Sequence, residues 1–96
     1  MGYVVGLLTI ELHLAACASL KEKRRRLKPL LARLHREFNV SAAEMGLQDS
    51  WQDAIISCAM VGNEQAFLQS ALSTVAAWVK RNWPDGMIVN HRIEIG

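Results

Sequence analysis

The stretch YVVGLLTIELHL, residues 3–14, decides the fold because its apolar side chains recur at every second position. This alternation predicts a β-strand with one face on a core. The predicted core face holds Val4, Gly6, Leu8, Ile10, Leu12 and Leu14. The other face holds Tyr3, Val5, Leu7, Thr9, Glu11 and His13. Gly6 has no side chain, so we expect a helix to approach the strand closely there.

A basic helix is predicted to follow this strand. Ser19 and Glu22 have the spacing of a capping box, which marks a helix N-terminus. The apolar stripe of the helix is Leu20, Leu27, Leu31, Leu34 and Phe38. Pro29 lies inside this segment and cannot bond the Arg25 carbonyl, so we expect it to kink the axis or to split off the first turns.

The rest of the chain adds a short strand, a longer strand, a helix and a final strand. NVSAAEMG (39–46), DAIISCAMVG (53–62) and MIVNHRIEI (87–95) are typical of strands. Asn63 is expected to cap the second helix. The expected apolar face of that helix is Phe67, Leu68, Ala71, Leu72, Val75, Trp78 and Val79. We interpret Trp51, in the loop before the third strand, as covering one end of the core, and presentation of Trp51 to a partner as the alternative.

The resulting βαββαβ order predicts an α+β, ferredoxin-like fold with a four-stranded antiparallel sheet and both helices on one face. A chain of 96 residues suffices for one domain, which we assign to residues 1–96. Glu11 interrupts the apolar run and no basic segment precedes it, so we expect a cytoplasmic protein without a membrane partner. Cys17 and Cys58 form no C-x-x-C pair, so we expect reduced thiols and no metal or other cofactor.

Positive charge is concentrated in the first helix. Residues 21–37 hold eight basic and two acidic residues, whereas the remainder holds three basic and seven acidic residues. Glu22 is placed to pair with Arg26, and Arg33 with Glu37. Four cations lie within an arc of about 100° opposite the apolar stripe, without an acid four residues away: Lys21, Arg25, Lys28 and Arg36.

These four cations have two interpretations, a phosphate-binding strip or a solvated helix face. If the strip binds RNA, it does so without the base-stacking aromatic residues of an RRM, because DAIISCAMVG has none and the first strand offers only Tyr3 at its edge. We therefore expect recognition of backbone and shape, and hence a structured RNA as the partner.

Four stretches together resemble a known family: ELHL, SLKEKRRRLKPLLARLHREFNVSAAEMG, QDSWQDA and the terminal EI. They are similar to the YlxP-like bacterial domains of unknown function, and the resemblance covers essentially the whole chain. It implies a small ferredoxin-like protein, often encoded near translation initiation and ribosome-maturation factors. No catalytic residues are established for that family. The resemblance favours a module associated with RNA or with a ribosomal subunit.

The uncovered sheet face is the second candidate surface. We expect Glu11, His13 and Arg92 to form a polar cluster there, suited to a small ligand or to acid/base chemistry, or to lie as ordinary surface residues. Val5, Leu7 and Ile88 on the same face suggest a homodimer interface. The alternative function is accordingly a homodimeric domain that senses a small molecule or binds a protein through this face.

Enzymatic activity finds little support in the sequence. An acylphosphatase-like site would require a glycine-containing phosphate cradle ending in Arg after the first strand, and AACAS contains neither residue. A metal-binding relative would require C-x-x-C in that loop, where Cys17 stands alone. No Cys or Ser has the spacing of a nucleophile and its base. We expect a protein that is not an enzyme.

Overall fold

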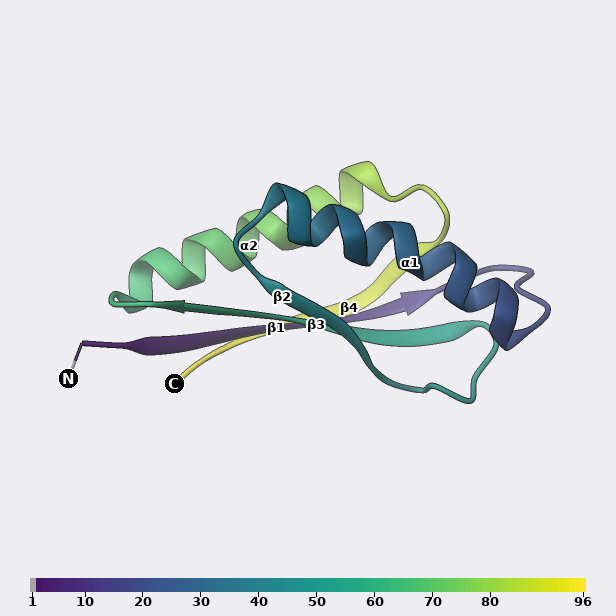
Figure 1. Ribbon diagram of the computed structural model, residues 1–96, viewed down its shortest axis with the longest axis horizontal. Coiled ribbons are helices and arrows are strands. Elements are labelled where there is room, and N and C mark those ends of the chain that lie inside the picture. The colour runs from purple at the N-terminus through teal and green to yellow at the C-terminus, as the bar shows by residue number, and fades with distance from the viewer. Residues whose placement is uncertain (1) are drawn as a thin grey trace.

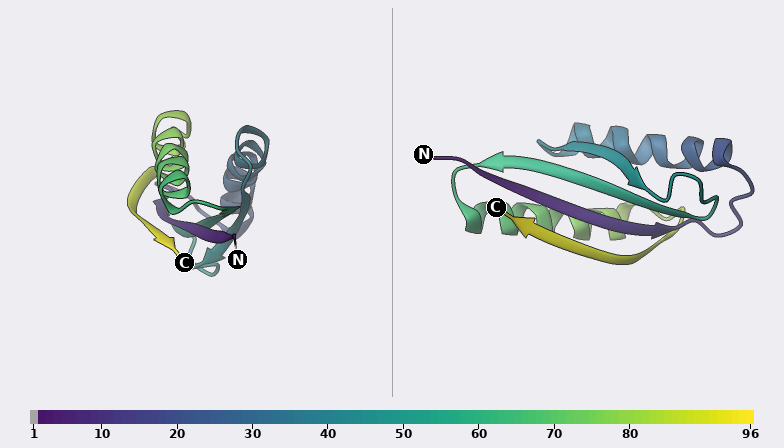
Figure 2. Two further views of the ribbon diagram at one scale, coloured as in Figure 1. Left: turned by 90° about the vertical axis from the view of Figure 1, so that its left-hand side faces the viewer. Right: turned by 90° about the horizontal axis from the view of Figure 1, so that it is seen from below.

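The computed structural model describes residues 2–96 and has the predicted βαββαβ order. Its elements are β1 (Val4–His13), α1 (Leu20–Glu37), β2 (Ser41–Gly46), β3 (Asp53–Gly62), α2 (Gln65–Asn82) and β4 (Met87–Ile95). The strands form one antiparallel sheet in the order β2-β3-β1-β4, with both helices on one side (Figures 1 and 2). The ferredoxin-like fold predicted from the sequence is confirmed.

The core lies between the helices and one face of the sheet. Leu8, Ile10 and Leu12 of β1 are fully buried there, as their alternation predicts. The expected close approach of a helix at Gly6 is also confirmed. A Cβ atom at Gly6 would lie 2.8 Å from Cδ1 of Leu72 in α2, so a side chain at that position would require the Leu72 side chain to move.

Helix α1 begins as predicted and is not divided at Pro29. The hydroxyl of Ser19 accepts a hydrogen bond from the backbone N–H of Glu22 at 3.1 Å, which caps the helix. The helix then runs unbroken to Glu37 with Pro29 inside it, so the expected separation of its first turns is wrong. Pro29 is exposed, and water can therefore hydrate the Arg25 carbonyl that it leaves without a donor.

Helix α2 departs from the sequence prediction at its N-terminus. Its N-cap is Glu64 rather than Asn63, and no side chain caps it. Phe67, expected in the apolar face, is 62% exposed. At the other end Trp83 is buried as the C-cap residue and anchors the helix to the core. Across residues 2–96, no helix combines the length and apolar character that crossing a membrane requires.

A β-bulge in β4 changes which of its residues face the helices. The pairing of β1 with β4 shifts between Glu11, which lies opposite Asn90, and Leu12, which lies opposite Ile88. Ile88 therefore shares the core face with the fully buried Leu12 and packs against the core. The prediction that Ile88 lies on the uncovered face is wrong, because strict alternation does not allow for the extra residue.

Candidate functional site

The side of α1 that faces away from the sheet carries the four cations singled out in the sequence. Lys21, Arg25, Lys28 and Arg36 are all exposed, and we call this surface the outer face of α1. Leu27, Leu30 and Leu34 fix its direction, because they bury the opposite side of the helix in the core. None of the four cations forms an ion pair with a carboxylate of residues 2–96.

Lys23 belongs to the same basic run but points into the protein. It is 1% exposed, and its ammonium donates hydrogen bonds to the backbone carbonyls of Leu47, Ser50 and Asp53 at 2.7, 2.7 and 2.8 Å. Glu44 Oε2 lies 3.1 Å from the same nitrogen. This role was not predicted from the sequence. Lys23 precedes Leu27 by four residues and so lies on the buried stripe, which is the signal that could have revealed it.

Arg26 and Arg33 also use their charges within the fold. The guanidinium of Arg26 lies 3.3 Å from Glu22 Oε2, which confirms the predicted pair, and 3.0 Å from Asp85 Oδ2. The hydrogen bond to Asp85 raises the pKa of Arg26 above its ordinary value. The predicted pair of Arg33 with Glu37 is wrong. Arg33 instead donates to the Asn82 carbonyl at 3.2 Å and stacks 4.8 Å from the ring centroid of Trp78, because α2 lies beside it.

The uncovered sheet face does not assemble the predicted polar cluster. His13 Nδ1 lies 2.9 Å from Asp53 Oδ1 on β3, a partner that was not predicted for it. Arg92 pairs with Glu94 on its own strand at 3.4 Å. Glu11 lies opposite Asn90, and within the described chain no ion pair joins it to His13 or Arg92. The three residues share a face but do not form one site.

One end of this face is apolar. Val5 lies opposite Val61 and Leu7 opposite Ala59 in the pairing of β1 with β3. Val5 is 44% exposed and Val61 is 65% exposed, while Leu7 is half-buried. We call Val5, Leu7, Ala59 and Val61 the apolar end of the open face. Two of the three residues predicted for a dimer interface remain in it, since Ile88 lies on the core side.

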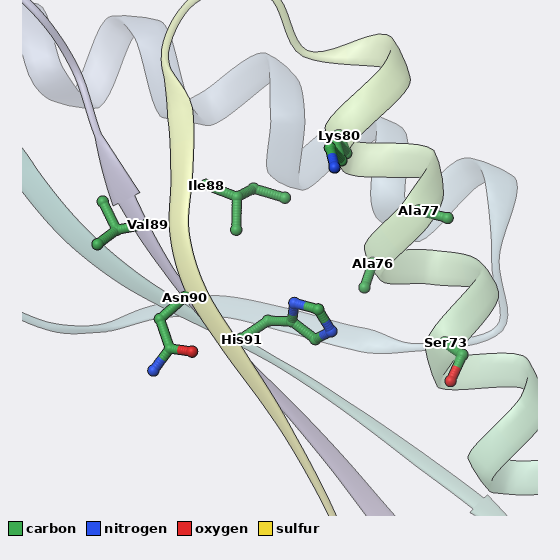
Figure 3. Close-up of a pocket in the computed structure, with 8 residues that line it drawn as sticks. All are labelled: Ser73, Ala76, Ala77, Lys80, Ile88, Val89, Asn90 and His91. Carbon is green, nitrogen blue, oxygen red and sulfur yellow. The ribbon is translucent and has the colours of Figure 1, made fainter.

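A shallow groove of about 480 Å³ lies between α2 and β4 (Figure 3). Its lining residues are Ser73, Ala76, Ala77, Lys80, Ile88, Val89, Asn90 and His91. The imidazole of His91 turns toward α2 and is exposed. In the part of the chain that the structure describes, no hydrogen bond links the Ser73, Lys80 and His91 side chains. The groove therefore lacks the bonded pair typical of a nucleophile and its base.

The two cysteines lie in the core. Cys17 and Cys58 are both free and buried. Burial raises the pKa of the Cys58 thiol from 9.0 to about 11, so this thiol stays protonated near neutral pH. Nowhere in residues 2–96 do three or more His, Cys, Asp or Glu side chains gather as a metal site would require.

Comparison with known proteins identifies relatives without assigning an activity. The family model of a protein of unknown function, DUF503, matches residues 5–93. The uncharacterized protein YlxP of Bacillus subtilis (strain 168) is 36% identical over 76 residues, which are 79% of this chain and 83% of that protein.

Two solved structures are similar to this chain at low sequence identity. A crystal structure described as an antibiotic biosynthesis monooxygenase from Bacillus cereus is 9% identical, with a TM-score of 0.48, and the match covers all of this chain and 92% of that one. The de novo designed protein Ferredog-Diesel is 14% identical, with a TM-score of 0.44 over 94% of this chain and 83% of the designed one.

Proposed function

The chain belongs to DUF503, a family of unknown function, as its resemblance to the YlxP-like domains predicted, and we propose that it is a non-enzymatic module that binds a structured RNA or a ribosomal particle. The proposed binding surface is the outer face of α1. The observation that carries this proposal is that the basic residues of one helix fall into two groups. Lys23, Arg26 and Arg33 are engaged inside the fold, whereas Lys21, Arg25, Lys28 and Arg36 are exposed without carboxylate partners in residues 2–96.

The dimensions of the outer face of α1 suit a phosphate backbone. At 1.5 Å per residue, the helix rises by ~22 Å between Lys21 and Arg36. Several phosphates of one nucleic-acid strand fall within that length. Each cation that neutralises a phosphate releases a condensed counterion, which favours binding at low salt.

The sheet supports recognition of RNA by the helix rather than by the strands. The two central strands, β1 and β3, contain no aromatic residue between Val4 and His13 or between Asp53 and Gly62. An RRM stacks bases on aromatic residues of its central strands, so this sheet has no equivalent platform. Contacts to backbone and shape remain, and these favour a folded RNA over an extended single strand.

Co-sedimentation with ribosomal subunits at low and at high salt tests the proposal. We expect the protein to pellet with a subunit at low salt and to be released at high salt, because phosphate contacts weaken as counterions become abundant. A protein that stays in the supernatant at low salt, and that also fails to bind folded RNA fragments, would contradict the proposal.

A second candidate function uses the open sheet face. The apolar end of that face is exposed, and both helices lie on the other side of the sheet (Figure 2). We propose that a second copy of the chain covers it, since a contiguous apolar patch on a sheet is often a subunit interface. A homodimer that senses a small molecule at this face is the corresponding function. A ligand-dependent rise in melting temperature without affinity for RNA would favour it over the first.

A further inference from the structure

The loop between β2 and β3, residues 47–52, presents an aromatic side chain to solvent. Trp51 is 55% exposed, so the interpretation that it covers the core is wrong. The other two tryptophans behave differently, because Trp83 is buried and Trp78 packs between Arg33 and Phe38. An exposed indole offers a large, rigid apolar surface and one N–H donor, a combination that suits contact with a partner.

The loop is held in place from inside. The buried ammonium of Lys23 bonds the carbonyls of Leu47, Ser50 and Asp53, which lie at the start, in the middle and just past the end of the loop. The loop also closes on itself, since the Ser50 N–H donates to the Leu47 carbonyl at 3.0 Å and the Asp53 N–H donates to the Ser50 hydroxyl at 3.2 Å. Trp51 thus sits on a preorganised loop, and a ligand that contacts it loses little affinity to ordering.

This loop lies beside the first turns of α1, at one end of the molecule (Figures 1 and 2). A hollow of about 270 Å³ joins the two elements, with Arg24 and Gln48 among its lining residues. Lys21, Arg24 and Arg25 are exposed on those first turns. An exposed indole and three exposed cations therefore occupy neighbouring segments.

We propose that Trp51 stacks on an unpaired base of the same RNA whose phosphates bind the outer face of α1. This inference rests on the proposed function and specifies the substrate as a folded RNA in which a paired segment adjoins unpaired nucleotides. An aromatic ring beside cations matches a nucleotide, which offers a flat apolar base and a phosphate. The cations favour a phosphate-bearing occupant over an apolar protein surface, which would leave them without partners.

The test compares two RNAs, a stem closed by an unpaired loop and the same stem as a continuous duplex. Trp51→Ala should weaken binding to the stem-loop by about 5- to 150-fold, the range for loss of one base stack, and leave binding to the duplex unchanged. Phe67→Ala is the matched control, because Phe67 is a 62% exposed aromatic residue on α2, which starts at the opposite end of the molecule (Figure 1). It should change neither affinity.

Tryptophan fluorescence supplies a second measurement. Binding of the stem-loop should quench part of the emission of the parent, and Trp51→Phe should abolish that quench, since the remaining tryptophans lie within the fold. Trp51 is exposed, so both variants should keep the circular dichroism spectrum of the parent.

Three results would overturn the inference, and they differ in whether they also contradict the proposed function. Equal binding of the stem-loop by the parent and by Trp51→Ala would exclude stacking and leave the proposed function intact. Loss of ribosomal co-sedimentation in Trp51→Ala with unchanged stem-loop binding would show that Trp51 contacts a protein instead. Absence of any RNA binding by the parent at low salt would overturn both proposals.

Discussion

The ammonium of Lys23 on α1 lies 3.1 Å from the carboxylate of Glu44 on β2, beneath a helix whose other side is covered with exposed cations. The basic side chains of this segment therefore fall into two groups, one engaged in the fold and one exposed to solvent. Lys23 connects α1 to β2 through its ion pair with Glu44 and to the following loop through its hydrogen bonds. Lys21, Arg25 and Lys28 are exposed to solvent. The two groups differ only in which side of the helix they occupy, and this difference makes them separable by mutation.

Replacement of Lys23 by Met should destabilise the fold strongly. The variant keeps an unbranched side chain but leaves the Leu47, Ser50 and Asp53 carbonyls without their donor and the Glu44 carboxylate without its counter-charge. We expect a loss of about 3–5 kcal/mol in the free energy of unfolding, measured by urea denaturation. Lys21→Met, on the exposed side, should change it by less than about 0.5 kcal/mol. Equal midpoints and slopes of the urea denaturation curves of the two variants would show that Lys23 contributes no more to stability than a surface lysine.

The raised pKa of Cys58 predicts a loss of stability in alkaline solution. The folded protein holds this thiol protonated up to about pH 11, whereas the unfolded chain ionises it at its ordinary pKa of 9.0. The stabilisation is thus fully present below pH 9 and is lost as the pH rises toward 11. We expect the free energy of unfolding of the parent to fall more steeply over this interval than that of Cys58→Ala. Parallel profiles would contradict the assignment.

The apolar end of the open face predicts self-association. Light scattering at tens of micromolar should show a dimer, and Leu7→Lys should shift it toward the monomer without loss of the fold, because a charge would then have to be buried in the interface. Phe67→Lys also places a charge on an exposed apolar residue, but on α2 across the sheet, and should leave the dimer intact. A parent that remains monomeric at that concentration would argue against the interface.

Local patterns were sufficient to predict the fold. The alternation in β1 identified its core face, Ser19 and Glu22 marked the start of α1, and the close approach of α2 followed from Gly6. Each of these signals lies within one element and depends on the periods of helices and strands. These signals can be recognised in the sequence without knowledge of the elements that pack against them.

Features that depend on distant partners were not predictable in this way. Lys23 finds its acceptors 24 to 30 residues further along the chain, so its role is visible only once α1 and the β2–β3 loop are together. The exposure of Trp51 likewise depends on where that loop lies in the folded chain. The bulge in β4 moved Ile88 to the core face by inserting a single residue. The exposed cations of α1 were identified correctly by position, since they oppose the buried stripe, whereas a binding partner for them is a proposal.

The salt dependence of RNA binding by a charge-depleted variant tests the central proposal most directly. Lys21→Gln, Arg25→Gln and Lys28→Gln combined should remove three phosphate contacts and flatten the slope of log affinity against log salt by about 2, at ~0.7 per contact. The matched control combines Lys80→Gln, Arg81→Gln and Arg92→Gln, which removes three charges outside α1 and should leave the slope nearly unchanged. If the outer face of α1 binds RNA, only the first variant has a flatter salt dependence and a lower affinity for RNA than the parent. Equal slopes of log affinity against log salt in the parent and in both variants would contradict the account.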